Sequence, residues 1–325
     1  MRWVVTGGAG YIGAHVVRAL LAAGEEAVVV DDLSTGLPER VPEGVPLHRG
    51  TVRDAGFVRK VFAAERADGV VHLAAKKSAP ESVERPAFYY HENVDGMLAV
   101  LDAMVDEGLD KIVLSSSAAV YGTSDAGAVT EDAPTRPESP YGQTKLASEW
   151  MVQSYAAVTG MSWVSLRYFN VVGAGAGDLG DTSEFNLVPL VFRALAEGRR
   201  PKVYGDDYPT RDGTCIRDYV DVVDLADAHA LAARRIAEGP QAATFNIGTG
   251  RGSTVLEVVE TVRDVTGLRF DHEVTGRRPG DPASIVADTA KIEREWGWRA
   301  RRDLRAMIEG SWRAWQQRQA KEESR

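Results

Sequence analysis

Cysteine is almost absent from this chain of 325 residues, in which Cys215 is the only one. A single cysteine excludes an intramolecular disulfide and a metal site built on several thiolates. Because proteins without disulfides are typical of reducing compartments, the composition predicts a cytoplasmic protein. The six histidines are dispersed and form no HExxH motif, so we expect no bound metal.

An excess of positive charge and long apolar runs are also missing. The chain has 38 Lys and Arg against 47 Asp and Glu, which gives a formal net charge of −9. An acidic chain without a concentrated basic patch repels phosphate backbones, which argues against nucleic acid as a partner. No stretch reaches the roughly 20 apolar residues of a membrane-spanning helix, so we predict no association with a membrane.

The first half of the chain alternates short apolar runs with helical patterns. Apolar runs predict strands at 3–5, 27–30, 69–75, 111–117 and 163–168, and helical periodicity predicts helices at 11–23, 87–107 and 141–159. The strands are apolar throughout, as in a parallel sheet that helices cover on both faces. The alternation therefore predicts an α/β fold with a Rossmann-type doubly wound parallel sheet.

The pattern changes after Asn170. Residues 171–181 read VVGAGAGDLGD, which predicts a loop leading into a smaller mixed α/β lobe. From there on we expect helices around 187–197, 222–237 and 255–266, strands at 202–204 and 244–247, a short final helix and a polar tail from residue 316. We expect two domains, with the division near residue 172.

A glycine-rich loop follows the first predicted strand directly. It reads TGGAGYIG over residues 6–13, it opens a helix, and Asp31 ends the next strand. Glycines let the backbone approach a pyrophosphate, the helix N-terminus favours its negative charge, and a carboxylate binds ribose hydroxyls. Because Asp31 would repel a 2′-phosphate, NAD is preferred over NADP. The predicted cofactor-binding residues of this segment are Gly7, Gly10, Tyr11, Ile12, Gly13 and Asp31.

Three serines end one predicted strand, and a tyrosine and a lysine open a predicted helix. Residues 115–117 stand at the carboxyl end of a parallel strand, where open α/β sheets bind their ligands. Tyr141 and Lys145 lie four residues apart in SPYGQTK, hence on one helix face. Free tyrosine titrates near ~10, and a lysine cation together with a nicotinamide charge favours its phenolate. Ser117, Tyr141 and Lys145 are therefore predicted to be catalytic and to handle a proton, with Ser117 holding a substrate hydroxyl.

These motifs together resemble the extended short-chain dehydrogenase/reductases, the NAD-dependent epimerase/dehydratase family, and within it the UDP-galactose 4-epimerases. The resemblance is carried by TGGAGYIG (6–13), DDLSTG (31–36), SSSAAVYG (115–122), SPYGQTK (139–145), RYFNVVGA (167–174), YGDDYPTRDGTCIRDYVDVVDLA (204–226) and RRPGDPA (277–283). It implies an isomerase that epimerises UDP-glucose or UDP-galactose at C4 with NAD, through a transient 4-keto sugar.

The resemblance also implies a role for each matching residue. Tyr141 would take the proton of the sugar 4-hydroxyl while hydride passes from C4 to the nicotinamide, and Lys145 would tune Tyr141 and hold the nicotinamide ribose. Lys77 and Asn93 would contact the cofactor. The UDP-sugar would be bound by Asn170, Asn186, Leu187, Tyr204, Arg217, Arg278 and Asp281.

Domain functions and assembly follow from the same resemblance. It implies an NAD-binding domain over 1–172, with returning segments from about 215–250, and a UDP-sugar-binding domain over 173–325. It also implies a homodimer, formed through the helices around 87–107 and 141–159.

Three residues depart from the pattern of the family. Thr51 stands where members usually have an aspartate near the adenine, and Ala119 stands where many have a threonine beside the substrate. Ile285 occupies the position whose bulk limits the 2-substituent of the sugar. UDP-N-acetylhexosamine and UDP-glucuronate therefore stay open as alternative substrates.

Two other functions of the same fold are less favoured. A nucleotide-sugar dehydratase needs an acid just after the strand-end serine, where this chain has Ala118 and Ala119. A non-catalytic NAD-binding protein commonly lacks the tyrosine or the lysine, whereas this chain keeps Ser117, Tyr141 and Lys145.

Overall fold

The structure of the protein, a computed structural model, describes residues 1–123, 127–183, 185–278 and 281–323. Pro279 and Gly280 of the RRPGDPA motif lie outside the described residues. The chain forms two units. The first takes in Met1–Gly122, Pro134–Tyr168 and Ala226–Phe245, and the second takes in Thr123–Ala133, Phe169–Leu225 and Asn246–Arg325.

One sheet organises the first unit. Among the described residues it has seven strands in the order β10-β6-β5-β4-β1-β2-β3. Their bounds are β1 (Arg2–Thr6), β2 (Glu26–Asp31), β3 (Leu47–Arg49), β4 (Gly69–His72), β5 (Lys111–Ser117), β6 (Ser162–Tyr168) and β10 (Ala242–Ile247). Neighbouring strands from β3 to β6 pair in parallel. The order reverses between β1 and β4, so the predicted Rossmann-type α/β fold is confirmed.

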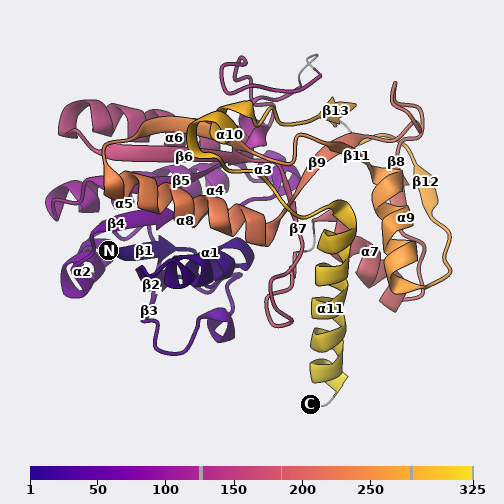
Figure 1. The fold of residues 1–325 in the computed structure, drawn as a ribbon, viewed down its shortest axis with the longest axis horizontal. Helices are drawn as coiled ribbons and strands as arrows, with labels where there is room; N and C mark the ends of the chain where they lie inside the picture. The colour runs from indigo at the N-terminus through magenta and orange to yellow at the C-terminus, as the bar shows by residue number, and fades with distance from the viewer. Residues whose placement is uncertain (124–126, 184, 279–280, 324–325) are drawn as a thin grey trace. The chain divides into compact units, whose positions relative to one another are not determined.

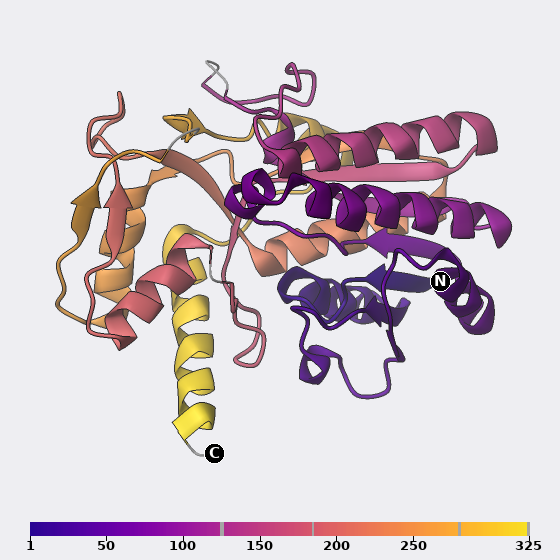
Figure 2. The same ribbon diagram turned by 180° about the vertical axis from the view of Figure 1, so that it is seen from behind.

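Helices cover both faces of this sheet. In Figure 1, α1 (Tyr11–Ala22) and α8 (Val222–Glu238) lie in front of it, and in Figure 2, α5 (Gly96–Asp106) and α6 (Pro140–Thr159) do. Shorter helical segments are α2 (Ala55–Glu65), α3 (Ala79–Glu84), α4 (Pro86–Tyr90) and the 3₁₀ turns η1 (Pro38–Arg40) and η3 (Ala118–Val120). Fully buried strand residues such as Val4 and Ile112 pack with Met97 and Leu101 of α5 in one core. The apolar runs of the sequence therefore correspond to strands buried on both faces.

The second unit is a smaller mixed α/β structure centred on one strand. That strand, β9 (Ile216–Asp221), pairs with β7 (Asn170–Val172), β11 (Gly252–Thr254) and β13 (Ser284–Ile285). A separate pair is formed by β8 (Lys202–Tyr204) and β12 (Glu273–Thr275). Helices α7 (Leu187–Ala196), α9 (Val255–Thr266) and α11 (Leu304–Glu323) enclose a core that includes Phe192, Val259 and Ile308, and α10 (Ala290–Trp296) precedes α11.

Two predicted elements of the first unit are shorter or interrupted. The strand expected over 69–75 ends at His72, where the hydroxyl of Thr6 accepts hydrogen bonds from the amides of Leu73 and Ala74 instead. The helix expected over 87–107 is interrupted by one π-helical turn, η2 (His91–Asp95), between α4 and α5. That turn contains the buried Asn93, and π-helical turns are frequent at functional sites.

The second unit departs further from the sequence prediction. The loop expected over 171–181 begins inside β7, and its partner β9 was not predicted, because charged residues interrupt the apolar pattern of β9. The final helix α11 is 20 residues long rather than short, and it continues through the polar tail to Glu323. Buried Met307 and Ile308 anchor its first half. Within the described ranges, no helix is long and apolar enough to cross a membrane.

Candidate active site

Helix α6 and the end of strand β5 bring together the three residues that were predicted to be catalytic. The helix starts after Ser139, whose hydroxyl accepts a hydrogen bond from the amide of Gly142, and Pro140 occupies its first position. Tyr141 and Lys145 consequently lie one turn apart at the beginning of the helix. Ser117, the last residue of β5, forms a hydrogen bond with the phenol of Tyr141.

Lys145 is buried and anchored on the neighbouring strand. Its Nζ donates to the carbonyl oxygen of Ser115 at 2.8 Å. Burial lowers the pKa of Lys145 to about 8, an effect that the carboxylate of Glu149 opposes. Lys145 therefore carries a proton at neutral pH and loses it as the pH rises through about 8.

Burial moves the pKa of Tyr141 in the opposite direction. Burial raises the pKa of its phenol, and the hydrogen bond with Ser117 lowers it only in part. Because the net shift is upward, burial disfavours the phenolate, and stabilising that anion requires positive charge close to the phenol. The amide of Ala119 donates to the Ser117 hydroxyl oxygen at 3.1 Å, so Ser117 can accept from Ala119 and donate to the Tyr141 phenol at the same time.

Sequence reasoning missed Glu149, which lies one turn after Lys145. Its two carboxylate oxygens accept from Arg167 on β6, with Nε at 2.9 Å and Nη2 at 2.6 Å, and from the hydroxyl of Ser116. All three side chains are buried. Removing one partner of such a buried ion pair costs about 3–5 kcal/mol. The regular spacing of Tyr141, Lys145 and Glu149, four residues apart, is the signal that could have identified it.

The predicted dinucleotide loop joins β1 to α1 and depends on its glycines. Gly7 has a φ of 72°, and a Cβ on Gly7 would lie 2.9 Å from the amide nitrogen of Ala74. A Cβ on Gly13 would lie 2.1 Å from the carbonyl oxygen of Gly7, so only glycine fits there. Helix α1, which starts with Tyr11 and Ile12 after Gly10, has no acidic residue in its first turn and no side-chain cap. Its N-terminal amides can therefore face an anion.

Asp31 ends β2 beside this loop. Its carboxylate is buried and accepts from the amides of Ala9 at 3.0 Å and Leu33 at 2.8 Å. Burial raises the pKa of Asp31, and these two hydrogen bonds counteract the rise. The glycine loop, the uncapped helix and the strand-end carboxylate together fit the pyrophosphate and ribose of NAD.

The other two predicted cofactor residues differ in their surroundings. Lys77 is exposed, between β4 and α3. Asn93 is buried, and its side chain bonds the amide of Lys76 at 2.8 Å, the carbonyl of Lys76 at 3.0 Å and the hydroxyl of Thr144 at 2.9 Å. Asn93 therefore connects the segment after β4 to Thr144 of α6, the residue immediately before Lys145.

Four of the predicted UDP-binding residues form two pairs in the second unit. Arg217 of β9 donates to the carbonyl oxygen of Pro282 at 2.8 Å and pairs with the Asp281 carboxylate at 3.4 Å. The guanidinium carbon of Arg278 lies 3.8 Å from the centre of the Tyr204 ring. Arg217 is thus paired with a carboxylate and Arg278 with an aromatic ring. These contacts orient both guanidinium groups.

The remaining predicted UDP-binding residues belong to other elements of that unit. Asn170 is exposed at the start of β7, in register with Tyr219 of β9. Asn186 precedes α7, whose first residue is Leu187, and its Nδ2 donates to Asp181 at 2.6 Å. Asn170 therefore adjoins the central strand β9, whereas Asn186 and Leu187 stand at the start of α7.

Two of the residues that depart from the family pattern have clear local roles. The hydroxyl of Thr51 accepts from the amide of Arg53 at 3.3 Å, in the turn before α2. Ile285 lies in β13, in register with Arg217 of β9, and is half-buried. The third, Ala119, contacts Ser117 through its backbone amide, which donates to the Ser117 hydroxyl oxygen.

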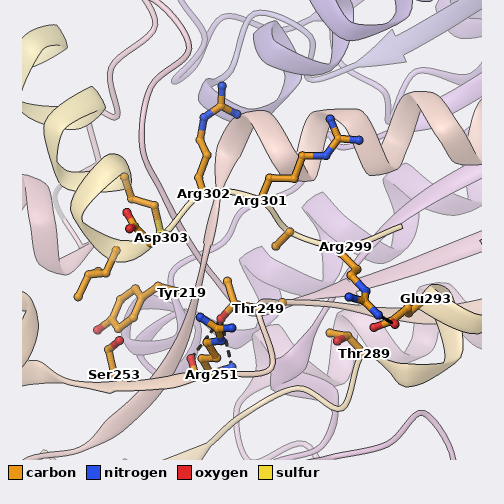
Figure 3. A pocket seen from close by; sticks show the side chains of 14 residues that line it. Tyr219, Thr249, Arg251, Ser253, Thr289, Glu293, Arg299, Arg301, Arg302 and Asp303 are labelled. Carbon is orange, nitrogen blue, oxygen red and sulfur yellow. Dashed lines mark hydrogen bonds and ion pairs between the residues drawn. The ribbon is translucent and has the colours of Figure 1, made fainter. Parts of the chain in front are cut away.

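A pocket of about 570 Å³ also lies in the second unit (Figure 3). It is lined by Tyr219, by residues around Arg251 and by the segment from Arg299 to Asp303. Figure 3 shows Arg299 paired with Glu293, while Arg301 and Arg302 extend away from Arg251. No predicted site residue is among its described lining residues, although Tyr219 and Ser253 are in register with Asn170 and Arg217 on neighbouring strands.

Curated relatives are similar to this protein over nearly its whole length. A UDP-glucose 4-epimerase of Streptomyces lividans is 46% identical over 315 residues, which cover 96% of this chain and 95% of that protein. A UDP-glucose 4-epimerase of Corynebacterium glutamicum is 44% identical over 317 residues, with the same coverage of 96% and 95%.

A solved structure shows the same likeness in three dimensions. The UDP-glucose 4-epimerase of Stenotrophomonas maltophila, with bound NAD and formylated UDP-arabinopyranose, superimposes with a TM-score of 0.94 at 37% identity. The match covers 99% of both chains. Residues 3–248 match the model of the NAD dependent epimerase/dehydratase family. With its glycine loop, its strand-end serines and its tyrosine–lysine helix, this chain belongs to the NAD-dependent epimerase/dehydratase family.

Proposed function

We propose that this protein is a UDP-glucose 4-epimerase, an NAD-dependent isomerase that interconverts UDP-glucose and UDP-galactose. The observation that carries the proposal is the meeting of Ser117, Tyr141 and Lys145 where α6 faces the end of β5. The likeness to UDP-glucose 4-epimerases at 44% and 46% identity supports the choice of substrate and reaction.

In the proposed reaction, Tyr141 holds and moves the proton of the sugar 4-hydroxyl. Ser117, whose hydroxyl bonds the Tyr141 phenol in this structure, would donate its proton to the same sugar oxygen while its own oxygen still accepts from the amide of Ala119. Lys145 supplies the positive charge that a buried phenolate needs. Bound NAD would supply the acceptor, and later the donor, of the hydride at C4.

We assign binding of the two ligands to the two units. Gly7, Gly10, Tyr11, Ile12, Gly13, Asp31, Lys77 and Asn93 of the first unit would hold NAD, together with Tyr141 and Lys145. The second unit would bind the UDP part, since a diphosphate needs fixed cations and Arg217 and Arg278 are both oriented. Tyr204 offers an aromatic face, and Asn170, Asn186, Leu187 and Asp281 complete the proposed set.

The sugar that binds opposite Tyr141 has two alternatives. UDP-N-acetylhexosamine stays a candidate because Ile285, in register with Arg217, is smaller than the tyrosine expected in strictly UDP-glucose-specific members. UDP-glucuronate is the weaker candidate, since the sequence offers no clear cationic pocket for its carboxylate. A dehydratase is disfavoured by Ala118 and Ala119, which leave no acid beside Ser117.

A homodimer in the cytoplasm is the proposed form of the enzyme. Two neighbouring helices leave large apolar side chains exposed, Leu98 and Val105 on α5 and Trp150 and Val158 on α6, of which Val158 is 88% exposed. Exposed apolar side chains on adjacent helices are typical of an interface. The cytoplasm is favoured by the single cysteine, which needs no oxidising compartment.

Assays with a panel of UDP-sugars test the proposed reaction. The purified protein with its bound cofactor is expected to equilibrate UDP-glucose and UDP-galactose from either side without added reductant, because the hydride returns to the sugar. Product ratios by anion-exchange chromatography measure this. Turnover of UDP-N-acetylhexosamines or UDP-glucuronate, with none of UDP-glucose, would contradict the glucose assignment.

Paired variants separate the proposed chemistry from the proposed binding. Tyr141→Phe is expected to reduce kcat by at least about 10²-fold with UDP affinity unchanged, since only the proton carrier is lost. Arg217→Gln is expected to weaken UDP binding about tenfold or more, because a charged contact to phosphate is removed. Tyr155→Phe, at a half-buried tyrosine of the same helix whose hydroxyl bonds Asp102 on α5, is the control and should keep normal kcat. Near-normal turnover in Tyr141→Phe would remove Tyr141 from the mechanism.

Sedimentation velocity tests the proposed dimer. Wild-type protein is expected to sediment as a dimer, and Trp150→Glu as a monomer, because a charge replaces a side chain that is 57% exposed in the single chain. Glu260→Gln, on α9 of the second unit, serves as the control and should stay dimeric. A monomeric wild-type protein at micromolar concentration would exclude this assembly.

A further inference from the structure

The carboxyl end of β5 is bound to α6 at three successive serines. Tyr141 bonds Ser117, Lys145 donates to the carbonyl of Ser115, and Glu149 accepts from the hydroxyl of Ser116. The helix residues are spaced four apart and therefore form one stripe along α6. Each of the three contacts consequently depends on the same register of the helix along the strand.

Glu149 is the member of this stripe with the strongest attachment. Arg167 of β6 holds both of its carboxylate oxygens, at 2.9 Å and 2.6 Å, and Glu149 is 1% exposed. Bidentate arginine–carboxylate pairs fix geometry as well as charge. Arg167 is fixed in turn, since Nη1 donates to the hydroxyl of Tyr121 at 3.0 Å and its guanidinium lies over the Tyr121 ring. The pair therefore joins α6 to β5 and β6 one turn beyond Lys145.

Among the described residues, two titratable groups interact electrostatically with Lys145, Glu149 on α6 and His72 on β4. On β6, Arg167 is paired with Glu149, and Tyr168 interacts with Tyr141. His72 is neutral at pH 7, because burial and then Lys145 lower its pKa to about 3. Burial raises the pKa of Tyr168, so it is neutral as well. Glu149 is the group that raises the pKa of Lys145 against the effect of burial.

We propose that Glu149 is a positioning residue for the epimerase reaction: held by Arg167, its carboxylate fixes the register of α6 on β5 and places a negative charge on the Lys145 side of the helix. Glu149 contacts neither substrate nor cofactor in this proposal, and it acts through Lys145 and Ser116. The inference rests on the proposed roles of Tyr141 and Lys145.

The direct test is a titration of Lys145 in the protein with its bound cofactor. The chain has eight lysines, so a spectrum of protein labelled with ¹³C-lysine is small enough to assign, with Lys145→Met identifying the signal. Glu149→Gln keeps the size and an oxygen acceptor for Ser116 but removes the charge. Its Lys145 is expected to titrate about one pH unit or more below that of the wild type, the usual effect of losing an adjacent opposite charge.

Two further variants separate this electrostatic effect from loss of stability. Glu149→Gln with Arg167→Gln leaves no unpaired buried charge, and the pKa of Lys145 should again fall. Val152→Ala, a fully buried apolar residue on the same helix, is expected to lower the melting temperature while leaving the pKa of Lys145 unchanged. An unchanged Lys145 pKa in both Glu149 variants, or an equal fall in Val152→Ala, would overturn the proposal.

The pH dependence of kcat supplies the functional readout. In the wild type, turnover should fall as the pH rises through the pKa of Lys145, about 8, because the cation is lost. In Glu149→Gln this alkaline limb should lie about one pH unit lower, so that the rate deficit grows with pH and levels off at about tenfold above the wild-type pKa. A rate loss that is equal at every pH would assign Glu149 a structural role alone and contradict the proposal. Absence of any epimerase activity in the wild type would instead refute the proposed function, while the titration still tests Glu149.

Discussion

The hydrogen bond from Lys145 to the carbonyl oxygen of Ser115 is the contact on which the candidate site depends. It is 2.8 Å long and joins the first turns of α6 to the carboxyl end of β5. Any slip of the helix along the strand would break it and would separate Tyr141 from Ser117 as well. The ends of parallel strands are where open α/β sheets bind their ligands, so this contact places a proton carrier at the edge of the sheet where chemistry can occur.

Burial has opposite consequences for the two ionisable groups that this contact brings together. It raises the pKa of Tyr141 and lowers that of Lys145 to about 8, so both neutral forms are favoured. A catalytic tyrosinate therefore needs charges placed within the protein rather than in solvent. The required positive charge is that of Lys145, whose protonated form the carboxylate of Glu149 favours, and Glu149 is itself balanced by Arg167. The charge state of Tyr141 thus depends on Lys145, that of Lys145 depends on Glu149, and Glu149 is held in turn by Arg167.

The sequence was sufficient for most strands and the long helices of the first unit because they have strong local signals, whereas β3 and α2 were not predicted. The strands are unbroken apolar runs, Ser139 and Pro140 mark the start of α6, and Gly13 occupies a place where a Cβ would collide with the backbone. The second unit was less predictable. Its central strand β9 carries Arg217, Asp218 and Asp221, and buried partners satisfy these charges only in the folded protein, as when Asp218 accepts from the amides of Thr249 and Gly250. Such long-range pairs leave no periodic pattern. The partner of Glu149, Arg167 on β6, was unpredictable for the same reason, although the four-residue spacing of Glu149 after Lys145 places it on the same face of α6.

In the proposed mechanism, the hydrogen at C4 of the sugar leaves and returns as a hydride, while Tyr141 handles the hydroxyl proton. The most direct measurement follows deuterium from UDP-[4-²H]glucose into UDP-galactose by mass spectrometry and NMR in ordinary water. We predict that the product retains the deuterium at C4, because a hydride held in the site does not exchange with solvent. Loss of the label to water at C4 would contradict this mechanism and would indicate that the protein abstracts the carbon-bound hydrogen as a proton.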